Sequence, residues 1–202
     1  MAYPTVNGPY GLEPVNLIGG QQFAGQTREI PIASAYNTNI FNGDVVKLNS
    51  DGTIVKDTGT STATPVGVFL GVSYTNPSTK QKLFAQYWPA GTVASDAYAY
   101  VADDPDQLFK VAAVSSGTTV AFYGQTLVGS NVALVQNSGS STTGDSAVAI
   151  DGTSTATTAS LPIRVIDVVP DTATGPRDNS STTYYEFLVK FNLHQYTDTT
   201  GI

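Results

Sequence analysis

The chain has 202 residues, a formal net charge of -7, no cysteine and a single histidine. These counts exclude disulfides, thiolate chemistry and cysteine-ligated metal, and a net acidic chain lacks the clustered Lys and Arg that a nucleic-acid backbone requires. Charged residues make up 12% of the chain, about half of the roughly 25% typical of globular domains, so the surface is expected to be polar but weakly charged.

Residues 1–26 are predicted to form an extended N-terminal arm. Prolines recur along this segment and oppose a helix, whereas its apolar content is too high for a solvated disordered tail. The arm therefore needs a surface to lie on, either its own body or a neighbouring subunit. Its candidate interface residues are Tyr3, Pro4, Tyr10, Leu12, Val15, Leu17, Ile18 and Phe23.

From residue 27 the chain becomes a series of short β-like runs separated by turn signals. The clearest is GDVVKLNSDGTIVKD (43–57), where Asp51 and Gly52 lie between two β-branched runs and predict a hairpin, because glycine accepts the positive φ of the turn. The next run, PVGVFLGVSY (65–74), is almost wholly apolar and predicts a strand buried on both faces.

The middle of the chain predicts further strands on either side of an acidic turn. Residues 82–114 alternate aromatic and small side chains and are interrupted at ADDPD (102–106). A short helix is expected somewhere in 116–130. The Ser-, Thr- and Gly-rich stretch 137–160 is expected to be the most loop-like part of the chain.

The C-terminal part returns to strand character in LPIRVIDVVPD (161–171) and in residues 182–196. Within the second run, alternate positions predict one apolar face and place His194 away from it; that face is formed by Tyr185, Phe187, Val189, Phe191 and Leu193.

The fold class expected from these patterns is all-β: a small barrel or sandwich of short antiparallel strands, with an extended arm and at most one or two short helices. The arm (1–26) is followed by a single β-rich body (27–202), with a possible subdivision near 115–136. No apolar run approaches the ~18 residues of a membrane-spanning helix, and no signal peptide is expected at the N-terminus.

The sequence predicts no catalytic, cofactor-binding or metal-binding residues. His194 has no carboxylate or nucleophile near it in the sequence and is expected to make a hydrogen bond or an interface rather than to act as a base. Asp103, Asp104 and Asp106 offer oxygen ligands for a cation but lack the glycine and glutamate of a calcium loop, which favours a solvated turn. A carboxylate pair of Asp96 and Asp103 is an alternative for hydrolysis, but an ordinary surface role is favoured.

Aromatic residues are the remaining candidates for binding. A sugar platform or a protein-binding surface is one interpretation of these residues and core packing is the other. Core packing is favoured for the single tryptophan. The set comprises Tyr74, Tyr87, Trp88, Tyr98 and Tyr100.

Several motifs together resemble virion proteins of tailed phages, particularly of phages that infect aquatic bacteria, and among them the head decoration (cement) proteins. The resemblance spans most of the chain and consists of strand and turn patterns rather than catalytic signatures. It is carried by AYPTVNGPYGLEPVNLIGG, GDVVKLNSDGTI, PVGVFLGVSY, VGSNVAL, TTGDSAVAIDG, LPIRVIDVV and VKFNLHQY.

This resemblance implies a non-enzymatic protein on the outer surface of the capsid, synthesised in the host cytoplasm. Its partners would be the major capsid protein and copies of itself, as a trimer or alternatively a dimer, with no direct contact to nucleic acid or membrane. The alternative is a tail-associated or surface module that recognises host glycan. A minor head or tail component is a further possibility, since strand patterns do not specify a location in the virion.

Overall fold

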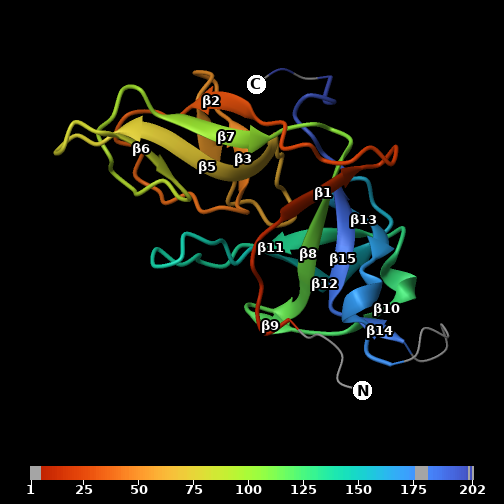
Figure 1. The fold of residues 1–202 in the computed structure, drawn as a ribbon. Coiled ribbons are helices and arrows are strands. Elements are labelled where there is room, and N and C mark those ends of the chain that lie inside the picture. Colours follow the sequence, from red (N-terminus) through yellow and green to blue (C-terminus); the bar gives the residue numbers. More distant parts are fainter. Residues whose placement is uncertain (1–5, 176–181, 200, 202) are drawn as a thin grey trace.

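The structure is a computed structural model that describes residues 6–175, 182–199 and 201, and it is almost wholly β (Figure 1). This confirms the all-β class. Two single turns of 3-10 helix, η1 (Gln125–Leu127) and η2 (Pro170–Thr172), are the helical segments in the described ranges. Neither has the length or apolar character to span a membrane.

The larger sheet closes into a barrel. Its strands run in the order β8, β12, β11, β13 and β15, and β15 pairs back onto β8. One edge of β8 pairs with β1 along its first half and with β12 further along. The end of β8 also pairs with β9. The strands are β1 (Glu13–Leu17), β8 (Gln107–Ser116), β9 (Thr119–Val120), β11 (Asn131–Val135), β12 (Ala149–Ala156), β13 (Ile163–Val168) and β15 (Glu186–Phe191).

The second sheet is antiparallel in the order β2-β7-β5-β3-β4, with β6 added to the far end of β5. A two-stranded ladder of β10 (Tyr123–Gly124) and β14 (Thr183–Tyr184) lies beside the barrel. The strands of the second sheet are β2 (Arg28–Pro31), β3 (Val45–Leu48), β4 (Ile54–Lys56), β5 (Gly67–Thr75), β6 (Lys82–Ala85) and β7 (Tyr98–Ala102).

Two hydrophobic clusters hold these sheets. One fills the barrel and also contains Val45, Val68 and Ala102 from the second sheet, whereas the other lies wholly within residues 30–101. The two clusters therefore meet at the end of the second sheet that carries Val45, Val68 and Ala102. The chain passes from the second sheet to the barrel between β7 and β8. The single body expected for 27–202 stays a prediction.

The local predictions for the hairpin and for the buried strand are confirmed. Strands β3 and β4 pair across the turn, with Leu48 opposite Ile54 and with Gly52 at a φ of +78°. Strand β5 is buried along almost its whole length, including Val68, Phe69 and Val72. Because β5 has nine residues, it can pair with three strands, β3, β6 and β7.

Two predictions are corrected. The loop expected over 137–160 contains β12, which lies between β8 and β11 and is parallel to β8. Ala149 and Ile150 of this strand, and Val148 just before it, are fully buried, so a short apolar run is sufficient for a central strand. His194 is also buried, at 2% exposure, because β15 ends at Phe191 and the strand period no longer applies beyond it.

Candidate functional site

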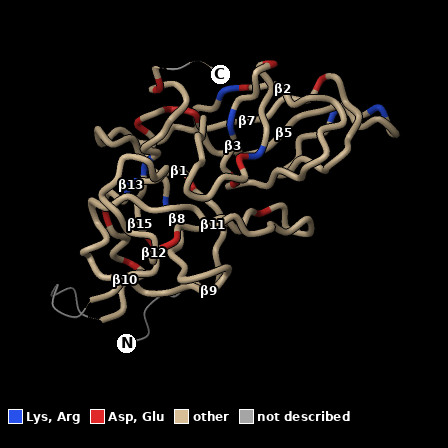
Figure 2. Tube along the Cα trace, turned by 180° about the vertical axis from the view of Figure 1, so that it is seen from behind, with Lys and Arg blue, Asp and Glu red and all other residues tan. Residues whose placement is uncertain are grey.

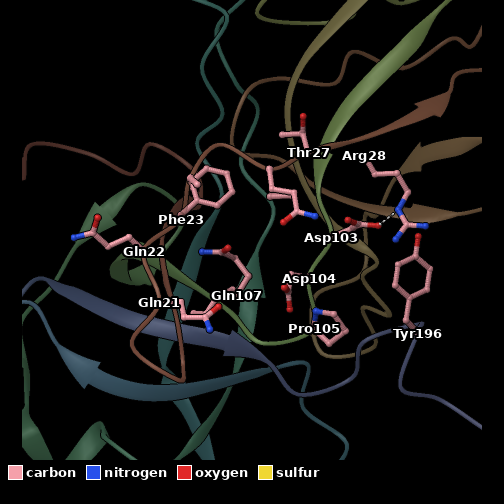
Figure 3. Close-up of a pocket in the computed structure, with 14 residues that line it drawn as sticks. Gln21, Gln22, Phe23, Thr27, Arg28, Asp103, Asp104, Pro105, Gln107 and Tyr196 are labelled. Carbon is pink, nitrogen blue, oxygen red and sulfur yellow. Dashed lines mark ion pairs between the residues drawn. The ribbon is translucent and has the colours of Figure 1, made fainter.

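A cavity in the described part of the chain lies where the two sheets meet, and Figure 3 shows its lining. Its volume is about 630 Å³. Three segments distant in sequence form it: the connection from β1 to β2 (residues 17–28), the acidic turn between β7 and β8 (102–107), and the C-terminal Tyr196. We refer to this cavity as the inter-sheet cleft.

A charged pair and an aromatic ring form one wall of the inter-sheet cleft. Arg28 Nε lies 2.6 Å from Asp103 Oδ2, and its guanidinium stands over the ring of Tyr196 at 5.3 Å from the centroid. Burial, followed by the neighbouring Asp103 carboxylate, raises the pKa of Tyr196. The phenol therefore stays protonated and remains a hydrogen-bond donor at neutral pH.

His194 is hydrogen-bonded to the backbone of Tyr196, next to this wall. Its Nδ1 accepts a hydrogen bond of 3.1 Å from the backbone N–H of Tyr196. Burial lowers the pKa of His194, and the negative charges of Asp103 and Asp104 partly oppose that effect. The imidazole is therefore neutral at neutral pH and acts as a hydrogen-bonding residue, as the sequence predicts.

The acidic turn does not bring its three carboxylates together. Asp103 pairs with Arg28, whereas Asp104 Oδ1 accepts the backbone N–H of Asp106 at 2.8 Å. Asp106 lies 2.6 Å from Lys190 Nζ in β15. Within the described residues, no group of three or more His, Asp or Glu side chains is placed to hold a metal ion.

Asp96 and Asp103 lie at opposite ends of β7. Five strand residues at about 3.3 Å each separate them by more than the roughly 5–9.5 Å between the carboxylates of a glycosidase pair. Asp96 instead accepts hydrogen bonds from Thr75 and lies 3.0 Å from Lys82 Nζ. These hydrogen bonds, those from Thr75 above all, lower the pKa of Asp96.

The N-terminal interface candidates are distributed between the core, the surface and the cleft. Tyr10 donates a hydrogen bond to Glu186 of β15, and Leu12 is buried in the barrel cluster at 1% exposure. Ile18 is 48% exposed. Tyr3 and Pro4 lie outside the described residues.

The rest of this segment is tied to the same chain. Leu17 lines the inter-sheet cleft, and the Val15 carbonyl accepts the N–H of Phe23, which packs against the barrel cluster. Lys110 of β8 lies 3.0 Å from Glu13. Residues 10–23 therefore lie on their own body, the first of the two alternatives left open by the sequence.

The aromatic candidates divide between the core and an open sheet face. Trp88 is fully buried, as predicted, and packs edge-on against Tyr74 at 5.5 Å between ring centroids. Tyr87 stacks on Phe41. Tyr98 and Tyr100 project from the face of β7 opposite Ala99 and Val101, which belong to the core.

That open face carries a row of side chains across four strands. Phe84 of β6 is opposite Ser73 of β5, Ser73 is opposite Tyr98 of β7, and Tyr98 is opposite Pro31 of β2. Phe84 is 75% exposed and Tyr98 is 41% exposed, whereas Ser73 between them is 4% exposed. We refer to Phe84, Ser73, Tyr98 and Pro31 as the outer row.

Sequence reasoning identified Tyr98 as a candidate but not its neighbours in the outer row. It also did not identify the glutamines of the cleft, Gln21, Gln22, Gln26 and Gln107. Neutral amides are common on polar surfaces, and no local sequence pattern distinguishes the glutamines that line one cleft in the folded chain from the others. Phe84 lies in an alternating run whose register against β5 cannot be read from the run itself. A scan against protein-family models and searches of curated proteins and of solved structures found no match to this chain.

Proposed function

We propose that this chain is a non-enzymatic structural protein of a tailed-phage virion, which decorates the outside of the capsid by binding the major capsid protein and copies of itself. The observation that carries the proposal is the outer row. Large apolar side chains exposed side by side on a regular, rigid sheet are typical of surfaces that bind another protein.

The outer row is ordered by backbone pairing rather than by loops. Tyr98 and Phe84 are held on either side of Ser73 by the ladders β5–β7 and β5–β6, and the low exposure of Ser73 indicates that they cover it. A partner that docks here meets side chains already in place. Little conformational entropy is then lost on binding, which favours affinity.

The charge around the outer row also favours a protein partner. Lys82, which is two residues from Phe84 on the same face of β6, is neutralised by Asp96. Along the described trace the charged residues are few, and long uncharged stretches separate single charges and short groups such as Asp103, Asp104 and Asp106, as Figure 2 shows. Such a surface supports close contact without the desolvation of many charges.

Repetition on a lattice makes a small surface sufficient. Burial of Phe84 and Tyr98 contributes roughly 1.5–3 kcal/mol each before ordering costs. A trimer, which the proposal favours over a dimer, presents several such rows at once and gains affinity through effective concentration. The contact to the shell is assigned to the sheet face because residues 10–23 are already used by the chain's own body.

The test is co-sedimentation of the purified chain with undecorated phage heads, after light scattering has given its oligomeric state. The double variant Phe84→Ser/Tyr98→Ser is expected to lose head binding, and Phe122→Ser is the control. Phe122 is 52% exposed but lies between β9 and β10, beside the barrel. A chain that does not bind heads, or a double variant with unchanged occupancy, contradicts the proposal.

A further inference from the structure

We propose that the inter-sheet cleft is a binding site for a short neutral saccharide. This goes beyond attachment to a capsid, since it uses a different part of the surface and a different kind of ligand.

The cleft contains exposed amide side chains that have no hydrogen-bond partner among the described residues. The side chains of Gln21, Gln22 and Gln26 make no hydrogen bond to any described residue, and all three line the cavity. An amide both donates and accepts, which matches a sugar hydroxyl, itself a donor and an acceptor. Several such groups around one cavity are suited to a ligand with several hydroxyls.

The floor and the far wall are fixed before any ligand arrives. Gln107 is 2% exposed and donates from Nε2 to the carbonyls of Asn16 and Leu108, at 3.1 and 2.8 Å. Asp103 is oriented by Arg28, whose guanidinium is in turn stacked on Tyr196. A preformed wall of this kind lowers the entropy lost when a ligand binds.

Aromatic rings lie at both ends of the cleft. Figure 3 shows Phe23 on the side of the glutamines and Tyr196 on the side of Arg28, with Asp104 and Gln107 between them. Phe23 offers an aromatic ring for the apolar C–H face of a sugar, while the hydroxyls of the sugar point to the polar groups around it. The ring of Tyr196 already carries the guanidinium of Arg28, so Tyr196 supports the polar wall of the cleft.

The charges disfavour other ligand classes. The cation of the cleft, Arg28, is already neutralised by Asp103, and Asp104 adds a second carboxylate. A phosphate or an acidic ligand would meet repulsion. The polar walls do not suit a lipid chain, and a volume of about 630 Å³ is within the roughly 300–1,000 Å³ of small-ligand sites.

The experiment measures binding of the full chain to an array of neutral oligosaccharides built from glucose, galactose, mannose, rhamnose and N-acetylglucosamine, followed by calorimetry with the best binder. The double variant Gln22→Ala/Gln26→Ala is expected to weaken binding about tenfold, because two hydrogen bonds lost at a net ~0.7 kcal/mol each amount to 1.4 kcal/mol. Tyr196→Ala is expected to weaken it similarly.

The control is Gln81→Ala, an exposed glutamine in the turn between β5 and β6, which is expected to bind as the parent does. Near-UV circular dichroism checks that each variant keeps its fold. An array without a neutral binder, preferential binding of anionic glycans or peptides, or a double variant with unchanged affinity overturns the proposal. The variant Phe84→Ser/Tyr98→Ser should still bind saccharide, which separates this result from capsid attachment.

Discussion

Ser146 Oγ donates a hydrogen bond of 2.7 Å to Asp44 Oδ1, and this bond joins the segment before β12 of the barrel to the segment before β3 of the second sheet. The other oxygen of Asp44 accepts hydrogen bonds from Lys56 Nζ at 2.8 Å and from the backbone N–H of Phe41 at 2.9 Å. Asp44 is completely buried. One carboxylate therefore ties the two sheets together and neutralises a lysine that has little access to solvent.

Replacement of this carboxylate should destabilise the fold strongly. Asp44→Ala leaves Lys56 without its partner in a buried site and is expected to lower the free energy of unfolding by about 3–5 kcal/mol. Ser146→Ala removes one hydrogen bond to a charged group and is expected to cost about 1.5–3 kcal/mol. Urea denaturation measures both values. Asp51→Ala, at an exposed carboxylate, is the control, and an equal loss in Asp44→Ala and Asp51→Ala would contradict the role given to Asp44.

The N-terminal segment should behave as part of the core. Leu12→Ala is expected to lower the free energy of unfolding by about 2–5 kcal/mol, because Leu12 is buried in the barrel cluster. Ile18→Ala, at a residue that is 48% exposed, is expected to change it by less than about 0.5 kcal/mol. Chemical denaturation of both variants tests this. Similar values for the two would indicate that residues 10–23 do not pack on the barrel.

The turn between β3 and β4 should require glycine at position 52 because of its backbone conformation, and not because a side chain would lack space. Gly52 has a φ of +78° and nothing within 4 Å of the position that a Cβ would take. Gly52→Ala is therefore expected to cost about 1–2 kcal/mol from the left-handed conformation and not from a clash. Gly8→Ala, which has equal space and no positive φ, is the control. Thermal unfolding should distinguish the two, and equal midpoints would argue against the turn.

Stability should decrease as the pH falls below the ordinary pKa of histidine. Burial holds the pKa of His194 below its usual value of 6.5, so the unfolded chain takes up a proton before the folded chain does. The stabilisation is complete above pH 6.5 and declines on acidification with a slope of up to about 1.4 kcal/mol per pH unit, until the folded pKa is reached.

Urea denaturation at pH 7.5, 6.5, 5.5 and 5.0 measures this decline. The variant His194→Asn keeps a hydrogen-bond acceptor for the N–H of Tyr196 but has no proton to gain, and it should show a shallower profile over the same range. Superimposable profiles for the parent and the variant would assign the pH dependence to the carboxylates instead.

The sequence by itself determined the elements whose signals are local. A glycine between β-branched runs specified the hairpin of β3 and β4, and a nearly continuous apolar run specified β5, because turn geometry and burial on both faces depend on neighbouring residues. Alternation placed Phe187, Val189 and Phe191 in the core. The all-β class followed from the same signals.

The tertiary structure alone decided how distant segments meet. β12 is a central strand because β8 and β11 complete its ladders, although its own Ser- and Thr-rich sequence is typical of a loop. The outer row depends on the register of β6 and β7 against β5, and the inter-sheet cleft depends on three segments that come together only in the folded chain. Such contacts depend on all the strand pairings that the chain forms together. The local periodicity of the sequence does not specify them.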